Sequence, residues 1–116
     1  MSDVTIYHNP RCSKSRQTLA IIEESGIVPN IVEYLTSPPD AETIKHILDM
    51  LKLEPRDLMR TKEAAYAENG LGNDALTSAE LIQAMVNHPI LIERPIVVKG
   101  NQAVVGRPPE NVAALI

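Results

Sequence analysis

The chain has a single cysteine and no phenylalanine or tryptophan among its 116 residues. One cysteine excludes an internal disulfide, so any disulfide formed at this thiol must involve a second molecule. The three tyrosines offer no aromatic platform for stacking bases, and the formal net charge of −4 opposes binding to a polyanion. The composition therefore argues against nucleic acid as a partner.

Long apolar runs are also missing. No stretch is long enough to cross a bilayer, and the N-terminus lacks the basic, apolar and small-residue order of a secretory signal. A lone cysteine also fits a reducing compartment. We therefore expect no membrane association and a cytoplasmic location. A chain of 116 residues can bury one aliphatic core without disulfides or metal, and we expect a single domain over residues 1–116.

The segment around the cysteine carries the clearest chemical signal. The β-branched and aromatic run Val4–Tyr7 predicts a short strand, which Asn9 and Pro10 end. After Cys12, apolar residues recur with helical spacing as far as a stop at Gly26. Cys12 is therefore expected at the first turn of a helix, where unpaired backbone N–H groups and the helix dipole favour a thiolate or a bound oxyanion.

The charges near the cysteine favour the same chemistry. No acidic residue occurs between Asp3 and Glu23, whereas four basic side chains lie close to the thiol: His8, Arg11, Lys14 and Arg16. Neighbouring positive charge lowers the pKa of a thiol and so makes it nucleophilic. Cys12 is thus the candidate nucleophile; the alternative is a small buried hydrophobic residue, as most free cysteines are. His8 is a candidate to lower the thiol pKa or to shuttle a proton, the alternative being a neutral loop histidine.

Ser15 occupies the position of the second thiol in a Cys-x-x-Cys redox motif. The serine could donate a hydrogen bond to the Cys12 thiolate or its adduct, or it could be an ordinary serine of a first helical turn. A two-electron reduction by thiols consumes two of them, and this chain supplies one. The second would have to come from glutathione or from a partner protein.

The order of the remaining elements predicts the fold class. Residues 30–35 favour a second strand, and helices are predicted at 40–51, 55–60 and 77–88, with a helical turn and a loop within 61–74. A hairpin follows, with strands 96–99 and 102–105, and then a closing helix over 110–116. This is an α/β chain with a mixed four-stranded sheet flanked by helices. A thioredoxin-like fold with a helical insertion at about 36–89 has this order, and Pro95 is then the candidate cis proline.

Three arginines are candidate ligands for a tetrahedral oxyanion: Arg60, Arg94 and Arg107. The planar guanidinium offers paired donors and keeps its charge when partly buried. Arg94 and Arg107 each precede a proline, which restricts their backbone. Taken singly, each could be a solvated surface arginine. His46 and His88 have no companions at ligand spacing, so no metal site is expected.

Over essentially its full length the chain resembles the glutaredoxin-linked arsenate reductases, the ArsC family. The matching pieces are Ile6 to Pro10, Cys12, Ser15-Arg16, Tyr34-Leu35, Pro38-Pro39, Arg60, the segment from Pro89 to Ile92, the segment from Arg94 to Val98, and Gly106-Arg107-Pro108. The resemblance implies a thioredoxin-like fold in which Cys12 attacks arsenate, His8 lowers the thiol pKa, and Arg60, Arg94 and Arg107 hold the oxyanion. It also implies no bound cofactor, glutathione as co-substrate and glutaredoxin as partner protein.

Two other functions fit parts of this pattern. The Spx-type regulators share the fold and bind RNA polymerase, but they usually carry Cys-x-x-Cys where this chain has Ser15. A glutaredoxin-like reductase of glutathione mixed disulfides would need a glutathione groove rather than an oxyanion pocket. The leading hypothesis is reduction of arsenate to arsenite through a covalent bond between Cys12 and arsenic, in support of arsenical resistance.

Overall fold

The computed structural model describes residues 3–116, so the first two residues of the predicted domain lie outside the described part. The chain forms two compact units. The first unit runs from the start of the chain to Ser37 and from Arg94 to Ile116, and the second runs from Pro38 to Glu93. The cysteine and two of the three candidate arginines therefore belong to the first unit.

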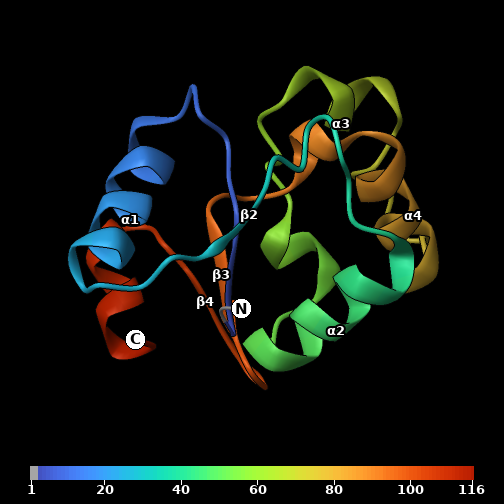
Figure 1. The fold of residues 1–116 in the computed structure, drawn as a ribbon. Helices are drawn as coiled ribbons and strands as arrows, with labels where there is room; N and C mark the ends of the chain where they lie inside the picture. Colours follow the sequence, from blue (N-terminus) through green and yellow to red (C-terminus); the bar gives the residue numbers. More distant parts are fainter. Residues whose placement is uncertain (1–2) are drawn as a thin grey trace. The chain divides into compact units, whose positions relative to one another are not determined.

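The first unit is built on a mixed sheet with the strand order β2-β1-β3-β4 (Figure 1). Its strands are β1 (Val4–Tyr7), β2 (Asn30–Val32), β3 (Ile96–Lys99) and β4 (Gln102–Val105). β1 is parallel to β2 and antiparallel to β3, and β3 and β4 form the antiparallel hairpin. The predicted four-stranded mixed sheet is confirmed.

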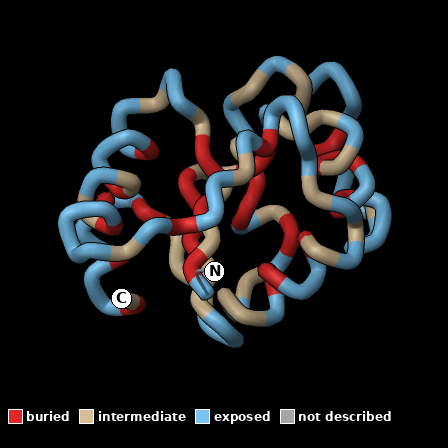
Figure 2. The backbone as a smooth tube through the Cα atoms, viewed as in Figure 1, coloured by how far each residue is buried: buried red, intermediate tan, exposed pale blue. Residues whose placement is uncertain are grey.

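Helix α1 (Ser13–Glu24) and the C-terminal 3₁₀ helix η3 (Pro109–Ala114) pack side by side against this sheet (Figure 1). The core between them is aliphatic, and Figure 2 shows buried positions along the strands and on α1. It comprises Val4, Ile6, Ile22, Val97, Val112 and Leu115. Burial of these side chains holds α1, the helix that follows Cys12, against the sheet.

β2 is shorter than the predicted strand over residues 30–35. It ends at Val32, and the carbonyl of Glu33 accepts hydrogen bonds from the backbone N–H groups of Thr36 and Ser37, at 3.0 and 2.9 Å. The backbone therefore forms a turn at Glu33, although the apolar residues Tyr34 and Leu35 extend the sequence pattern of a strand. Tyr34 is nonetheless only 1% exposed, so its burial comes from a turn rather than from the sheet.

The end of the chain is helical as predicted, but it is a 3₁₀ helix rather than an α-helix. The helix begins at Pro109, directly after a second proline. Neither proline can donate a backbone hydrogen bond, which limits regular helix formation at this point. The Asn111 side chain instead donates hydrogen bonds to the carbonyls of Val105 and Arg107, both at 3.2 Å. These bonds fix the segment to the end of β4.

The strand register brings three chain segments to one end of the sheet. Tyr7, the last residue of β1, is opposite Ile96, the first residue of β3. Ile96 is in turn opposite Val105, the last residue of β4. Three segments therefore lie at the same end of the sheet. They are the loop that carries Cys12, the Arg94-Pro95 pair before β3 and the Arg107-Pro108 pair after β4.

At Gly106 the backbone packs closely against both α1 and the segment before β3. The Gly106 N–H donates a hydrogen bond to the Pro95 carbonyl at 2.9 Å. A Cβ atom at position 106 would lie 2.6 Å from Thr18 Oγ1 and 2.8 Å from Pro95 Cγ, which is closer than real Cβ atoms come. Thr18 is fully buried, and its hydroxyl donates to the Lys14 carbonyl at 2.8 Å. Only glycine permits this close approach.

The second unit is helical in its regular elements. These are α2 (Ala41–Leu51), η1 (Pro55–Leu58), α3 (Ala64–Glu68), α4 (Ser78–Asn87) and η2 (Pro89–Leu91). The predicted start signals are confirmed: Asp40 accepts a hydrogen bond from the Thr43 N–H at 2.8 Å, and Thr77 and Glu80 form a capping box. No helix within residues 3–116 is long and apolar enough to cross a membrane.

The contact at Gly106 generates a prediction about stability. Gly106→Ala places a methyl group against Thr18 and Pro95 and should lower the free energy of unfolding by about 1–3 kcal/mol, as overpacking does. Urea unfolding measures this loss. Gly72→Ala is the matched control, because a Cβ there meets only Tyr66 Cε1 at an ordinary 3.7 Å. Equal stability of the two variants would contradict the account.

Candidate active site

Cys12 is the residue immediately before the first turn of α1. Its backbone is extended (φ −94°, ψ 122°), and its N–H donates to the Asn9 carbonyl at 3.0 Å. The first turn of α1 contains no acidic residue. The side chain is partly exposed, so a reactant can reach the sulfur. The predicted position of the thiol at a helix start is confirmed.

The environment lowers the pKa of the Cys12 thiol below its ordinary value. Burial alone raises the pKa, because it disfavours the charged thiolate. The backbone N–H groups of Ser15 and Lys14, directed at the sulfur, and the guanidinium of Arg94, which acts through its charge and as a hydrogen-bond donor, together outweigh that effect. The thiolate is thus stabilised by the helix start and by an arginine more than eighty residues away in sequence.

The Ser15 side chain joins the two ends of the loop that carries the cysteine. Its hydroxyl is completely buried, lies 2.6 Å from His8 Nδ1 and accepts a hydrogen bond from the Asn9 N–H at 3.0 Å. Because Oγ accepts the Asn9 hydrogen, its own proton is free to point at His8 Nδ1. This arrangement favours the His8 tautomer with the hydrogen on Nε2. The backbone N–H of Ser15 faces Cys12, while its hydroxyl holds the loop.

His8 is buried, with 6% of its surface exposed. Burial lowers the pKa of its imidazole, with Arg16 acting in the same direction and Glu33 and Glu23 opposing it. The ring is therefore mostly neutral at pH 7, which suits the hydrogen bond that Nδ1 accepts from Ser15. A neutral His8 can take up or pass on a proton, but it does not place a standing positive charge beside the thiolate.

Asn9 is a positioning residue that sequence reasoning missed. Its side-chain Oδ1 accepts the Arg11 N–H at 3.0 Å, and its carbonyl accepts the Cys12 N–H at the same distance. Arg16 reaches back from α1 and donates from Nη1 to the Pro10 carbonyl at 2.9 Å. The Asn9-Pro10 pair predicts the end of the strand, and it is also a turn signal that points to this role.

Arg94 and Arg107 lie at the adjacent ends of β3 and β4. Arg107 Nη1 donates a hydrogen bond to the Arg94 carbonyl at 3.4 Å. The peptide bonds of Arg94 with Pro95 and of Arg107 with Pro108 are both cis. Arg94 is the one whose guanidinium acts on the Cys12 sulfur, whereas Arg107 is exposed at the surface. The structure therefore brings together Cys12 and Arg94, with Arg107 hydrogen-bonded to the latter.

Arg60 belongs to the second unit. Its backbone N–H donates to the Leu91 carbonyl at 2.7 Å, next to a β-bridge between Met59 and Ile92. Its guanidinium forms a partly exposed ion pair with Glu63 at 2.5 Å. Such a pair contributes little to stability, so it restrains the arginine only weakly.

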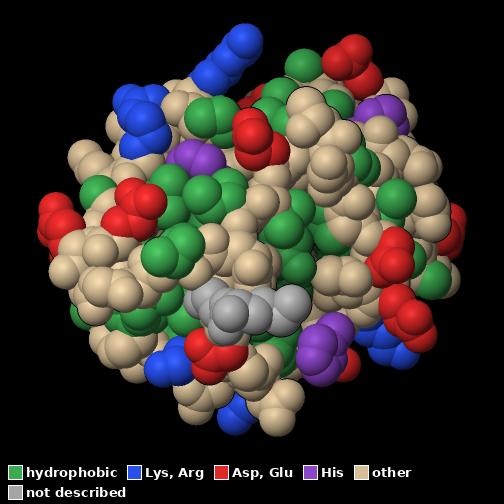
Figure 3. Space-filling model, viewed as in Figure 1, with side chains coloured by type: hydrophobic (Ala, Val, Ile, Leu, Met, Phe, Trp, Pro, Cys, Tyr) green, Lys and Arg blue, Asp and Glu red, His purple; other side chains and the backbone are tan. Residues whose placement is uncertain are grey.

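Basic side chains gather at the surface over the loop between β1 and α1, with hydrophobic side chains directly below them (Figure 3). A cavity of about 290 Å³ opens beside this loop, and residues of the loop line it together with residues that follow β2.

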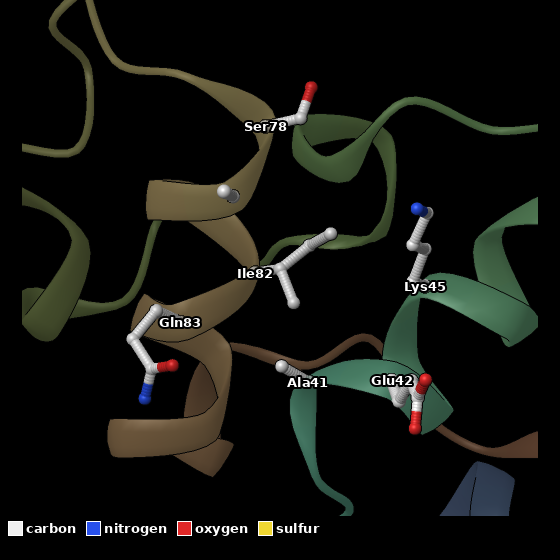
Figure 4. Close-up of a pocket in the computed structure, with 7 residues that line it drawn as sticks. Ala41, Glu42, Lys45, Ser78, Ile82 and Gln83 are labelled. Carbon is white, nitrogen blue, oxygen red and sulfur yellow. The ribbon is translucent and has the colours of Figure 1, made fainter.

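In the second unit, a cavity of about 510 Å³ lies between α2 and α4. Figure 4 shows Ile82 reaching into it between Lys45 and Gln83, with no nucleophilic thiol or histidine among the residues that line it. Among the described residues, no group of three or more His, Cys, Asp or Glu side chains could hold a metal ion.

The first prediction from this geometry concerns the charge of the thiol. Arg94→Gln removes a positive charge and a donor from the thiolate, so the pKa of Cys12 should rise and its alkylation at pH 6 should slow severalfold. The pH dependence of alkylation by iodoacetamide measures this directly, because the chain has one cysteine. Arg107→Gln is the matched control and should move the midpoint less. An unchanged midpoint in Arg94→Gln would contradict the account.

A second prediction concerns the buried hydroxyl. Ser15→Ala leaves His8 Nδ1 and the Asn9 N–H without their shared partner, and should cost about 1–3 kcal/mol of unfolding free energy. Ser13→Ala, at an exposed position of the same turn, should change stability little. Urea unfolding of both variants tests this. Equal, small losses would mean that the hydroxyl does not hold the loop.

Comparison with known proteins identifies the family of this chain. The family model described as "ArsC family" matches residues 7–115. An arsenate reductase of Neisseria meningitidis serogroup A is 46% identical over the whole of both chains, and an uncharacterized Escherichia coli K12 protein is 50% identical over 97% of this chain and 96% of its own. A solved structure titled as an arsenate reductase from Vibrio cholerae has a TM-score of 0.95 at 50% identity, over 97% of each chain.

These matches agree with the geometry of the site. The mixed sheet, the cysteine at the start of α1 and the Arg-Pro pair before β3 are arranged in a thioredoxin-like fold, as are the arsenate reductase structures that the chain resembles. The matched region contains Cys12 and all three candidate arginines. The chain therefore belongs to the ArsC family.

Proposed function

We propose that this protein reduces arsenate to arsenite, with glutathione and glutaredoxin supplying the thiols that the chain lacks. The observation that carries the proposal is a single cysteine whose thiolate is stabilised both by helix N–H groups and by the Arg94 guanidinium. The same donors that favour a thiolate also favour an oxyanion bound beside it. Relatives named as arsenate reductases, with 46% identity to this chain, support arsenate as that oxyanion.

The chemistry begins with attack of the Cys12 sulfur on arsenic. A bond forms between sulfur and arsenic, and one arsenate oxygen leaves as water after taking up protons. Glutathione then adds its thiol to the arsenic. Two electrons pass to arsenic as the Cys12 and glutathione sulfurs leave it and join in a disulfide, and the arsenic is released as arsenite. Glutaredoxin then removes the glutathione from Cys12 by disulfide exchange, which restores the Cys12 thiol and completes the cycle.

The side chains of the site have separate roles in this proposal. Arg94 and Arg107 bind and neutralise the arsenate oxygens from the ends of β3 and β4, where the sheet register holds them. Neutral His8 takes up or returns a proton as oxygen leaves. Ser15 holds the loop by its hydroxyl and faces the sulfur with its N–H. Arg60 enters as an oxyanion ligand from the family resemblance alone.

The test is arsenate-dependent consumption of NADPH, with glutathione, glutaredoxin and glutathione reductase supplied. Cys12→Ser should reduce the rate to background because no nucleophile remains. Arg94→Ala should lower the rate about 10²- to 10³-fold, as loss of an oxyanion donor does. Lys99→Ala, on β3 but at the far end from Arg94, is the matched control and should keep the wild-type rate.

Other outcomes would point to other functions. A flat wild-type trace, with Cys12 still reacting quickly with a thiol probe at pH 6, would contradict arsenate reduction. Activity on a glutathionylated peptide that survives Arg60→Ala, Arg94→Ala and Arg107→Ala would favour a glutaredoxin-like reductase. Co-purification with RNA polymerase, without arsenate turnover, would favour a regulator.

A further inference from the structure

We propose that the cavity between α2 and α4 is a binding site for a small apolar molecule that carries one carboxylate, such as a medium-chain or aromatic monocarboxylate. This inference goes beyond the proposed function and uses none of the residues that carry it. The cavity measures about 510 Å³ and lies wholly within the second unit. Its volume falls within the range of small-molecule sites, which runs from about 300 to about 1,000 Å³.

The first turns of two capped helices form the walls of this cavity. α2 begins after Asp40, whose side chain accepts the Thr43 N–H at 2.8 Å, and α4 begins after Thr77, which forms a capping box with Glu80. The caps hold each first turn in helical geometry. On each helix the lining residues recur about one turn apart, so they share one face, and the two helices pack against each other. The site is therefore formed before a ligand arrives.

The floor between the walls is apolar. Ile82 is 8% exposed, and Figure 4 shows its side chain in the gap between the two helices. Ala41 on α2 and Ala79 on α4 complete this floor. Their short side chains leave the space open and offer no hydrogen bond. Such a floor favours a ligand whose body is apolar, because binding removes apolar surface from water.

A cation and a hydroxyl group lie at one end of the cavity. In Figure 4, the Lys45 amine and the Ser78 hydroxyl lie on the same side of Ile82, although they come from different helices. Within residues 3–116, neither side chain has an ion-pair or hydrogen-bond partner. An ammonium group and a hydroxyl group both donate hydrogen bonds to a carboxylate. This end of the cavity therefore favours an anionic head on the ligand.

The other end disfavours a second negative charge. Glu42 and Gln83 lie on the opposite side of Ile82 from Ser78, and the Glu42 carboxylate points away from Lys45 (Figure 4). In the part of the chain that the structure describes, Glu42 forms no ion pair that would neutralise it. A carboxylate placed here would be repelled, whereas an apolar or neutral group would not. The charges thus match a monocarboxylate better than a dicarboxylate.

Titration of the ¹⁵N-labelled chain with octanoate, octanamide and octanedioate tests this site, because the three ligands share one chain length and differ in charge. Octanoate should shift the amide resonances of α2 and α4 with a dissociation constant of about 1 mM, as expected for a ligand of its size. Octanamide and octanedioate should bind about threefold to fivefold more weakly, because the first lacks the charge and the second places a carboxylate beside Glu42.

Variants assign each preference to a side chain. Lys45→Gln should remove the preference for octanoate over octanamide, and Glu42→Gln should remove the preference over octanedioate. Ala79→Leu fills the cavity and should weaken binding of all three ligands. Lys62→Gln and Ala67→Leu are the matched controls, at exposed positions of the second unit outside the cavity, and should change no dissociation constant. The same spectra show that each variant is folded.

Three results would overturn the proposal. The first is a set of octanoate-induced shifts that lies outside α2 and α4. The second is equal binding of octanoate and octanamide by the wild-type chain, and the third is a preference for octanoate that survives Lys45→Gln. None of these results bears on arsenate reduction, because the cavity contains no residue of the proposed catalytic site.

Discussion

The chemistry of this protein depends on how one loop is held between β1 and α1. A single buried hydroxyl, that of Ser15, contacts both His8 and the Asn9 backbone and so fixes the start of the loop to the first turn of the helix. The N–H groups of that same turn are directed at the Cys12 sulfur. Ser15, which stands where a Cys-x-x-Cys motif has its second cysteine, therefore holds the loop in place through its hydroxyl.

The second constraint is the register of the sheet. Because β1 and β4 both pair antiparallel with β3, the end of β1 and the two Arg-Pro segments come to the same end of the sheet. Gly106 allows the backbone after β4 to touch both Thr18 of α1 and Pro95 before β3. Close packing therefore places a guanidinium from the C-terminal half of the chain beside a thiolate from its N-terminal loop.

Local patterns predicted most of this architecture. The strands around the Gly100 turn, the Cys12 position and the helix starts at Asp40 and Thr77 follow from propensity and capping, which act over a few residues. The turn at Glu33 was not predicted, because the apolar residue Tyr34 after it is buried and so has the sequence pattern of a strand residue. The sequence indicates that cations next to the cysteine in the chain lower the pKa of its thiol. In the structure, the groups that lower this pKa are the backbone N–H groups of Ser15 and Lys14 and the guanidinium of Arg94, which the tertiary fold brings to the sulfur.

The central claim is that Cys12 forms a covalent bond to arsenic but cannot reduce it alone, since two electrons require a second thiol. The most direct test mixes arsenate with an equal amount of protein, free of other thiols, and quantifies arsenite by chromatography with elemental detection, before and after glutathione is added. The account predicts arsenite only after glutathione addition, at a rate above a protein-free control and lost in Cys12→Ser. One arsenite per protein without any external thiol, or arsenite formation at the wild-type rate by Cys12→Ser, would contradict it.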